Sequence, residues 1–212
     1  MTGVQTCALP IYCATAHNLA QKDSDGDGSG NACDLETLVI QRDLGGSVAD
    51  ATVSCARPSA ALGLSPTLTT GPLASGAGST RTLLRFDVGA LPPLAIVESI
   101  ELTLWKKQSY RNGTLSLHPV TAAWDEATVT WNSFGDSYGP ALGTLALSGP
   151  SPIAPTSGSV LFDTTNAPGL AALIESWRAD PAANLGLLLE QVHSSTELGS
   201  SEDIAANRPR LV

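Results

Sequence analysis

Carboxylate side chains recur at alternate positions near the start of the sequence, where Asp23, Asp25 and Asp27 are followed by Asp34. Gly28 stands at the sixth place of this twelve-residue segment, where calcium loops use glycine to make a sharp turn. Ca²⁺ binds roughly six to eight hard oxygen ligands, and alternate carboxylates on a tightly turning backbone supply them. The segment therefore predicts a site for Ca²⁺, the expected cofactor. The predicted ligands are Asp23, Asp25, Asp27, Asp34, the backbone carbonyl of Ser29 and water.

The residues around this loop resemble a thrombospondin type 3 repeat. The resemblance rests on the order of Cys13, Asn18, Gln21, the acidic loop, Gly30 and Cys33. Two positions depart from the family pattern, because Leu19 stands where the family usually has Pro and Asn31 where it usually has Asp. The second change removes one carboxylate and weakens the case for a second ion. The resemblance implies a calcium-binding repeat at residues 12–36.

Two other interpretations of the loop were weighed. A solvated acidic linker is one, since Asp, Gly and Ser are common in flexible connections, but composition alone does not require the twelve-residue register. A dockerin is the other, because the residues after Asp34 could open a short helix, giving an attachment module over residues 23–42. Gly30 and Cys33 argue against a dockerin. A dockerin has an aliphatic residue in the place of Gly30 and does not need a cysteine in the place of Cys33.

The two ends of the sequence are unusual. Residues 1–11, MTGVQTCALPI, resemble the translation of a high-throughput sequencing adapter, so we expect them to be an artefact and leave them out of the fold prediction. Residues 208–212 have the pattern of a strand that stops without a turn. We therefore expect an internal fragment of a larger protein, with its signal peptide missing and neighbouring domains among its partners.

The cysteines indicate an oxidising, extracellular compartment. Setting Cys7 aside with the first eleven residues leaves Cys13, Cys33 and Cys55. A calcium loop and a low lysine content in the sequence fit a compartment where disulfides persist. Thrombospondin type 3 repeats usually link the cysteine of one repeat to that of the next. The resemblance thus implies that Cys13 pairs upstream and that Cys33 pairs with Cys55. A Cys13–Cys33 bond is the alternative, and the sequence leaves both open.

Composition excludes two classes of partner. Hydrophobic residues make up 42% of the chain and charged residues 15%, as is ordinary for a domain with a hydrophobic core. The formal net charge is -9, and neither part of the chain has an excess of basic residues, so we expect no nucleic acid partner. No apolar run approaches the roughly 20 residues that cross a bilayer, so we expect no membrane insertion.

Beyond residue 49 the pattern is mainly that of β-strands. Apolar residues alternate with polar ones in three runs, at residues 51–55, 100–104 and 115–117, as in half-buried strands. Gly-Pro and Pro-Pro pairs separate the runs, and Asn112-Gly113 predicts a tight turn between strands at 100–106 and 114–120. Many short strands predict a β-sandwich. One helix is predicted by the spacing of Leu170, Leu173, Ile174 and Trp177, with Pro168 at its start and Asp180-Pro181 at its end.

Four stretches within this region resemble the DNRLRE domain. They are RTLLRFD at 81–87, AWDEATVTWN at 123–132, LGLLL at 185–189 and SEDIAANRP at 201–209, the last of which keeps the family pattern only in part. The resemblance implies a jelly-roll-like module of secreted and cell-surface microbial proteins, some of which are carbohydrate-binding modules for acidic polysaccharides. The predicted organisation is an all-β, jelly-roll-like sandwich with one short helix at 49–212, preceded by a linker at 37–48.

The large aromatic residues are expected mainly in the core, because the chain contains few of them. Val129 and Trp131 share one face of a predicted strand, so Trp131 is expected to point inward. Trp124 precedes that strand and is the aromatic candidate for contact with a sugar. Core packing is its alternative, since sugar sites need an exposed aromatic platform.

Two arginines are candidates for binding an acidic ligand. Arg81 and Arg85 lie four residues apart on one predicted strand, so they share a face and could present guanidinium groups to uronate carboxylates. The alternative, which we favour, is an internal ion pair with Asp87 or Glu101. Lys106, Lys107 and Arg111 form a basic group that is expected to be a solvated strand edge.

No arrangement of catalytic residues stands out. His17, His118 and His193 lie in unrelated contexts, outside metalloprotease or serine hydrolase motifs. Glycoside hydrolysis needs two carboxylates about 5–9.5 Å apart, and nothing singles out a pair. The carboxylates that could in principle supply such a pair are Asp125, Glu126, Glu202 and Asp203. We therefore predict a non-catalytic, extracellular or cell-surface module that binds polysaccharide. A structural spacer in an adhesion protein and an accessory domain of a polysaccharide-degrading enzyme are the alternatives.

Overall fold

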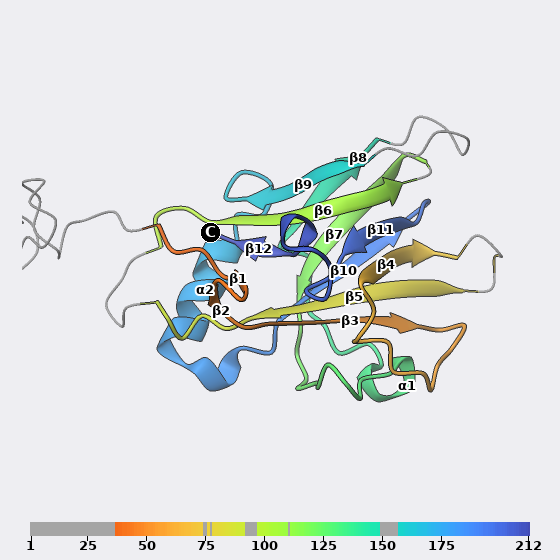
Figure 1. Cartoon of the computed structure of the whole chain (residues 1–212), viewed down its shortest axis with the longest axis horizontal. Helices are drawn as coiled ribbons and strands as arrows, with labels where there is room; N and C mark the ends of the chain where they lie inside the picture. The colour runs from red at the N-terminus through yellow and green to blue at the C-terminus, as the bar shows by residue number, and fades with distance from the viewer. Residues whose placement is uncertain (1–36, 74–75, 77, 92–96, 110, 149–156) are drawn as a thin grey trace, which may run out of the picture. The chain divides into compact units, whose positions relative to one another are not determined.

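The computed structural model describes residues 37–73, 76, 78–91, 97–109, 111–148 and 157–212 (Figure 1). A compact unit spans Leu38–Val212. The elements are, in chain order, β1 (Gln41–Arg42), β2 (Gly45–Gly46), β3 (Val48–Ser54), β4 (Thr67–Pro72), β5 (Ser79–Phe86), β6 (Glu101–Ser109), β7 (Gly113–Pro119), α1 (Trp131–Phe134), β8 (Gly143–Leu147), β9 (Gly158–Asp163), α2 (Leu170–Ala179), the 3-10 turn η1 (Pro181–Ala183), β10 (Leu187–Val192), β11 (Thr196–Gly199), the 3-10 turn η2 (Ala205–Asn207) and β12 (Arg210–Leu211).

Apart from β1 and β2, which form a separate short parallel pair, the strands form two antiparallel layers. One layer has the order β9-β6-β11-β4, with β12 also paired to β6, and the other has the order β3-β5-β10-β7-β8. The layers are joined at one edge, where Gly71 and Pro72 of β4 pair with Thr80 and Ser79 of β5. The predicted all-β, jelly-roll-like sandwich is confirmed.

The main hydrophobic core lies between the two layers. The period-two runs predicted from sequence direct Leu102 and Leu104 of β6 and Leu115 and Leu117 of β7 into this core, where all four are fully buried. Phe86 of β5, which lies in the same layer as β7, is buried in this core as well. Burial of such side chains is worth about 1.5–3 kcal/mol each, which makes this core the main source of stability.

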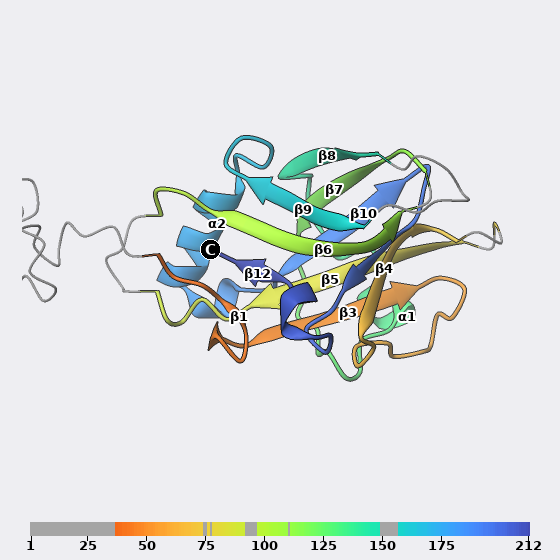
Figure 2. The same cartoon turned by 45° about the horizontal axis from the view of Figure 1, so that its top comes forward.

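The predicted helix is confirmed as α2, at one end of the sandwich (Figures 1 and 2). Its residues Leu170, Ile174 and Trp177 are buried in the main core, which is the face that their spacing predicts. The helix ends where the backbone of Asp180 becomes extended, and the carboxylate of Asp180 then accepts a hydrogen bond from the Ala182 backbone nitrogen at the start of η1.

A second, smaller core, which we call the outer core, covers the outer face of the β3-β5-β10 layer. It contains Leu83 of β5, Leu188 of β10 and the segment from Val120 to Tyr138, with Trp124 and Phe134 buried in it. The strand predicted around residue 131 is wrong. A helix begins at Trp131 instead, because Thr130 caps the short helix α1 in a capping box with Ser133. Trp131 is half-buried.

The two strands predicted on either side of Asn112-Gly113 are present as β6 and β7, but they do not pair with each other. β6 pairs with β9, β11 and β12, whereas β7 pairs with β8 and β10, so the two strands belong to different layers. The turn therefore carries the chain across the sandwich. Residues 38–48 belong to the sandwich and do not form a linker, because Ile40 is buried in the main core and pairs with Leu211.

Candidate functional site

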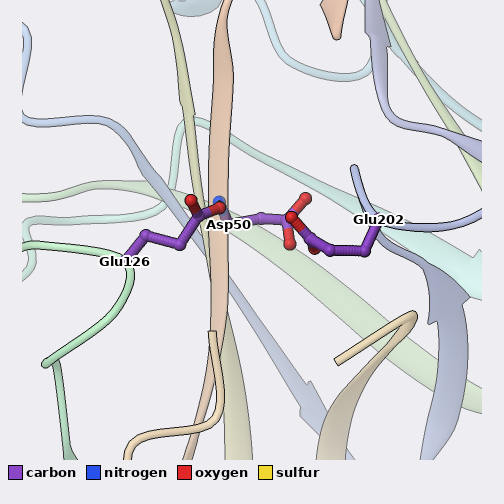
Figure 3. Close-up of side chains that lie close together, drawn as sticks. All are labelled: Asp50, Glu126 and Glu202. Carbon is purple, nitrogen blue, oxygen red and sulfur yellow. The ribbon is translucent and has the colours of Figure 1, made fainter. Parts of the chain in front are cut away.

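Three carboxylates that are far apart in the sequence meet beside β3. Asp50 lies on β3, Glu126 in the segment that follows β7, and Glu202 in the turn after β11. Each offers a carboxylate oxygen, and these atoms all lie within 4.8 Å of one another. Figure 3 shows Glu126 and Glu202 approaching Asp50 from two sides. We call these three residues the acidic cluster.

Asp50 occupies a position that would suit an apolar residue. Along β3, Ala51 and Val53 pack into the outer core, so Val48 and Asp50 face the interior between the layers, where Asp50 is fully buried. Its Oδ2 accepts a hydrogen bond of 2.6 Å from the Ser201 backbone nitrogen. Its Oδ1 is buried and has no hydrogen-bond partner among the described residues. A buried oxygen without a partner is costly and needs a ligand or a proton.

Glu126 binds the open edge of β3. On its other edge β3 pairs with β5, and the Asp50 backbone nitrogen donates a hydrogen bond of 2.7 Å to Glu126 Oε1. The absence of a side chain at Gly63 allows the Glu126 backbone to come close, since a Cβ there would lie 1.8 Å from the Glu126 carbonyl oxygen. Backbone contacts thus fix the place of this carboxylate.

Arg42 is the cation of this group. Its Nη2 lies 3.4 Å from Glu126 Oε2, and its Nη1 forms an ion pair with Glu202 Oε1. Ser201 Oγ donates a further hydrogen bond of 3.1 Å to the same Glu202 oxygen, whereas Glu202 Oε2 is buried without a partner in the described structure. One guanidinium therefore faces three carboxylates, so the group has an excess of negative charge when all three are ionised.

The cluster changes the titration of Asp50. Burial, followed by the negative charges of Glu202 and Glu126, raises the pKa of the Asp50 carboxyl from 3.8 to about 8, although the hydrogen bonds from Ser201 oppose the shift. Without another positive charge, Asp50 therefore keeps its proton at neutral pH. A bound cation would favour the ionised form instead.

A pocket of about 500 Å³ adjoins the acidic cluster and shares Glu126 with it, and Arg42, the cation beside the cluster, also lines the pocket. The pocket is lined by Arg42, Ser47, Val48, Ala49, Arg85, Phe86, Asp87, Glu126, Pro181 and Asn184. Arg85 projects from β5, where its guanidinium lies 5.1 Å from the centre of the Trp124 ring and its Nη1 donates to the Trp124 carbonyl oxygen at 3.2 Å. These contacts fix the position of the guanidinium at the pocket wall.

Arg81 is not part of this pocket, although it shares a face of β5 with Arg85. Its guanidinium forms ion pairs with Asp136 at 2.8 Å and Glu190 at 3.0 Å, and its side chain is 12% exposed. It also lies 4.8 Å from the ring centres of Trp131 and Tyr138. Arg81 thus makes the internal ion pair expected of these arginines, with partners other than Asp87 and Glu101.

Trp124 is a core residue in this structure. It is 8% exposed, its ring packs in the outer core beside Arg85, and its Nε1 donates a hydrogen bond of 2.8 Å to the Leu185 carbonyl oxygen. The ring therefore offers no open face on which a sugar could stack. Of the two interpretations offered for Trp124, sugar contact and core packing, the structure fits core packing.

The predicted calcium ligands Asp23, Asp25, Asp27, Ser29 and Asp34 lie outside the described residues, as does Cys33. Cys55 follows β3, and its Sγ accepts a hydrogen bond of 3.1 Å from the Ser79 backbone nitrogen. The Cys33–Cys55 disulfide and the calcium loop stay predictions.

The acidic cluster was not predicted as a site. In the sequence, Glu126 and Glu202 are candidates only as catalytic carboxylates, and Asp50, which precedes the predicted half-buried run at 51–55, is not singled out. The outer core buries the face of β3 with Ala51 and Val53, so the face with Asp50 lies in the interior between the layers. The signal available in the sequence was Asp50 itself, an acidic residue next to the apolar alternation of the predicted strand.

The sequence matches carbohydrate-binding module family 96 over residues 46–151. This range covers β3 to β8 and therefore includes Asp50, Arg85 and Glu126. The chain belongs to this family. No curated protein matches the chain. None of the helices in the described part of the chain is both long and apolar enough to span a membrane.

Proposed function

We propose that the domain at residues 38–212 is a non-catalytic module that binds an acidic polysaccharide in the pocket lined by Arg85. Membership of a carbohydrate-binding module family supports a carbohydrate as the ligand. The observation that carries the proposed location is that Arg85, whose guanidinium is held by Trp124, lines the pocket together with Asn184. Sugar sites combine such a concave surface with a few placed polar groups.

The chemistry of Arg85 favours a carboxylated sugar. A guanidinium has five N–H donors in a fixed plane, and the hydrogen bond to the Trp124 carbonyl uses one of them. The remaining donors suit a uronate carboxylate, which accepts two parallel hydrogen bonds from an arginine. Asp87 and Glu126 line the same pocket and can accept hydrogen bonds from sugar hydroxyls.

The calcium loop and the compartment belong to the same proposal. Ca²⁺ held by Asp23, Asp25, Asp27, Ser29 and Asp34 would neutralise carboxylates that otherwise repel one another, and it would order the segment before the sandwich. Carbohydrate-binding modules usually act outside the cell, which supports an extracellular or surface location and a larger parent protein with further domains.

Affinity electrophoresis of the full chain tests the proposal. Gels containing alginate, polygalacturonate or chondroitin sulfate are compared with gels containing neutral cellulose or xylan derivatives. We expect retardation by an acidic polymer and a loss of affinity of about tenfold or more in Arg85→Gln, since a hydrogen bond to a charged group is worth about 1.5–3 kcal/mol. Arg57→Gln removes the same charge from an exposed position outside the pocket lining and serves as the matched control.

Arg85→Lys separates charge from geometry. It keeps the positive charge but loses the planar donor arrangement, so we expect it to bind more weakly than the wild-type chain. Circular dichroism confirms that each variant is folded. The proposal is overturned if no acidic polymer retards the folded chain, or if Arg85→Gln and Arg57→Gln weaken binding equally. The first outcome would favour a structural spacer.

A further inference from the structure

We propose that Asp50, Glu126 and Glu202 form a binding site for one Ca²⁺ ion inside the sandwich, separate from the loop at residues 23–34. The three side chains come from β3, the segment after β7 and the turn after β11, so the ion would join parts of the chain that are distant in sequence. The site is independent of the proposed polysaccharide pocket in its chemistry, although Glu126 borders both.

Two buried oxygen atoms point to a missing ligand. Asp50 Oδ1 and Glu202 Oε2 are both buried and have no hydrogen-bond partner among the described residues, and Asp50 is fully buried. Figure 3 shows the side chains of these two residues meeting, and a carboxylate oxygen of one lies within 4.8 Å of a carboxylate oxygen of the other. Two carboxylates in such contact repel each other unless a proton or a cation lies between them.

Arg42 does not meet this need. Its guanidinium binds Glu126 Oε2 and Glu202 Oε1, which leaves the other oxygen of Glu202 and the Oδ1 of Asp50 without a positive partner. An ion beside those oxygens would add the positive charge that one guanidinium among three carboxylates does not supply.

The ligand type and the spacing fit calcium. All three side chains are carboxylates, which suit Ca²⁺ or Mg²⁺, whereas zinc sites are built largely from histidine and cysteine. Ca²⁺–oxygen distances of about 2.3–2.6 Å place opposite ligands about 5 Å apart. The cluster oxygens lie within 4.8 Å of one another, so they can share one such ion. Mg²⁺ demands stricter octahedral geometry, which carboxylates from three separate segments are less suited to supply.

The test uses the full chain with the loop at residues 23–34 silenced by Asp23→Asn, Asp25→Asn and Asp27→Asn. After treatment with EDTA and removal of the chelator, calorimetric titration with Ca²⁺ should find one binding event. Thermal unfolding should show a higher Tm in Ca²⁺ than in EDTA, because an ion that binds only the folded state stabilises it. Mg²⁺ should bind more weakly.

Three substitutions in the loop-silenced chain locate the site. Glu126→Gln keeps an oxygen that can accept from the Asp50 backbone nitrogen and removes only the charge, while Asp50→Asn and Glu202→Gln remove the buried charges. Each should weaken Ca²⁺ binding about tenfold or more and reduce the Tm increase. Glu98→Gln, at an exposed position, removes the same single negative charge and should change neither quantity.

The proposal is overturned if the loop-silenced chain binds no Ca²⁺ and its Tm is the same in Ca²⁺ and EDTA. It is also overturned if Glu126→Gln and Glu202→Gln bind Ca²⁺ as tightly as the Glu98→Gln control. This comparison of the glutamate variants remains informative even where Asp50→Asn does not fold. Tighter binding of Mg²⁺ than of Ca²⁺ would overturn the choice of ion. Because the readouts use the metal alone, failure to bind polysaccharide does not affect them.

Discussion

Arg81 and Arg85 lie four positions apart on the same face of β5, yet only Arg85 lines the pocket. Carboxylates from two other segments, Asp136 and Glu190, hold Arg81 at 2.8 and 3.0 Å, whereas Arg85 lies over the Trp124 ring. Identical residue types on one strand face thus have different environments, and substitution should separate a stabilising role from a binding role.

Arg81→Gln should lower the free energy of unfolding by about 2 kcal/mol without changing the affinity of the folded chain for polysaccharide. The reason is that half-buried Glu190 loses its charged partner, while the ion pair with exposed Asp136 contributes little because solvent screens it. Urea denaturation measures the stability change. An unchanged stability combined with lost binding would show that Arg81 contacts the ligand.

Trp124→Phe should cost about 1 kcal/mol of stability, because the Leu185 carbonyl loses the hydrogen bond from the indole nitrogen. Trp124→Ala should cost about 3–5 kcal/mol, since it leaves a cavity in the outer core. Polysaccharide affinity measured under conditions where Trp124→Phe is folded should equal that of the wild-type chain. A large loss of affinity in a stable Trp124→Phe variant would contradict the core role.

The stability of the metal-free chain should depend on pH through Asp50. Burial raises the pKa of this carboxyl from 3.8 to about 8, with Glu202 and Glu126 adding to the shift, the Ser201 hydrogen bonds opposing it, and Arg42 as the nearby cation. The folded chain therefore holds a proton that the unfolded chain releases. This contribution to stability is fully present below about pH 4 and is lost as the pH rises towards 8.

Urea denaturation in EDTA at intervals across this range, with wild type and Asp50→Asn side by side, measures this effect. The stability of the wild-type chain relative to the variant should fall as the pH rises, because the asparagine cannot ionise. Parallel pH profiles for the two chains would contradict the assignment.

Gly63→Ala should destabilise the domain by about 1–3 kcal/mol, because the added methyl group would lie 1.8 Å from the Glu126 carbonyl oxygen and would displace that segment. Gly89→Ala is a suitable comparison, since its methyl group would meet only the side chain of Asp87. Thermal unfolding of both variants tests the difference. Equal Tm values would show that the Glu126 segment moves without cost.

Periodicity predicted the parts of the fold that local sequence determines. The spacing of Leu170, Ile174 and Trp177 located α2, and the alternation of Leu102 and Leu104 located β6 together with its buried face. Strand partners were not predictable in the same way. The pair Asn112-Gly113 predicted a tight turn between two strands, but only the structure shows that these strands join different layers.

The candidate site was less accessible to prediction than the fold. A period of two separates the faces of β3 but does not say which face a segment 70 or more residues later covers. That segment covers the face with Ala51 and Val53, which leaves Asp50 facing the interior between the layers. The meeting of Asp50, Glu126 and Glu202 is a property of tertiary structure. The shared face of Arg81 and Arg85 was predictable, but their separate environments depend on residues from other segments.

The pairing of Ile40 with Leu211 has a mechanical consequence. The two residues are joined by backbone hydrogen bonds of 2.8 and 2.9 Å in an antiparallel bridge, so the chain before Ile40 and the chain after Leu211 lie at the same end of it. A tensile load applied through these two flanks would peel the bridge open from that end, breaking its bonds in sequence rather than together. The sandwich should therefore begin to yield under tension at β12, while the interior strands still resist.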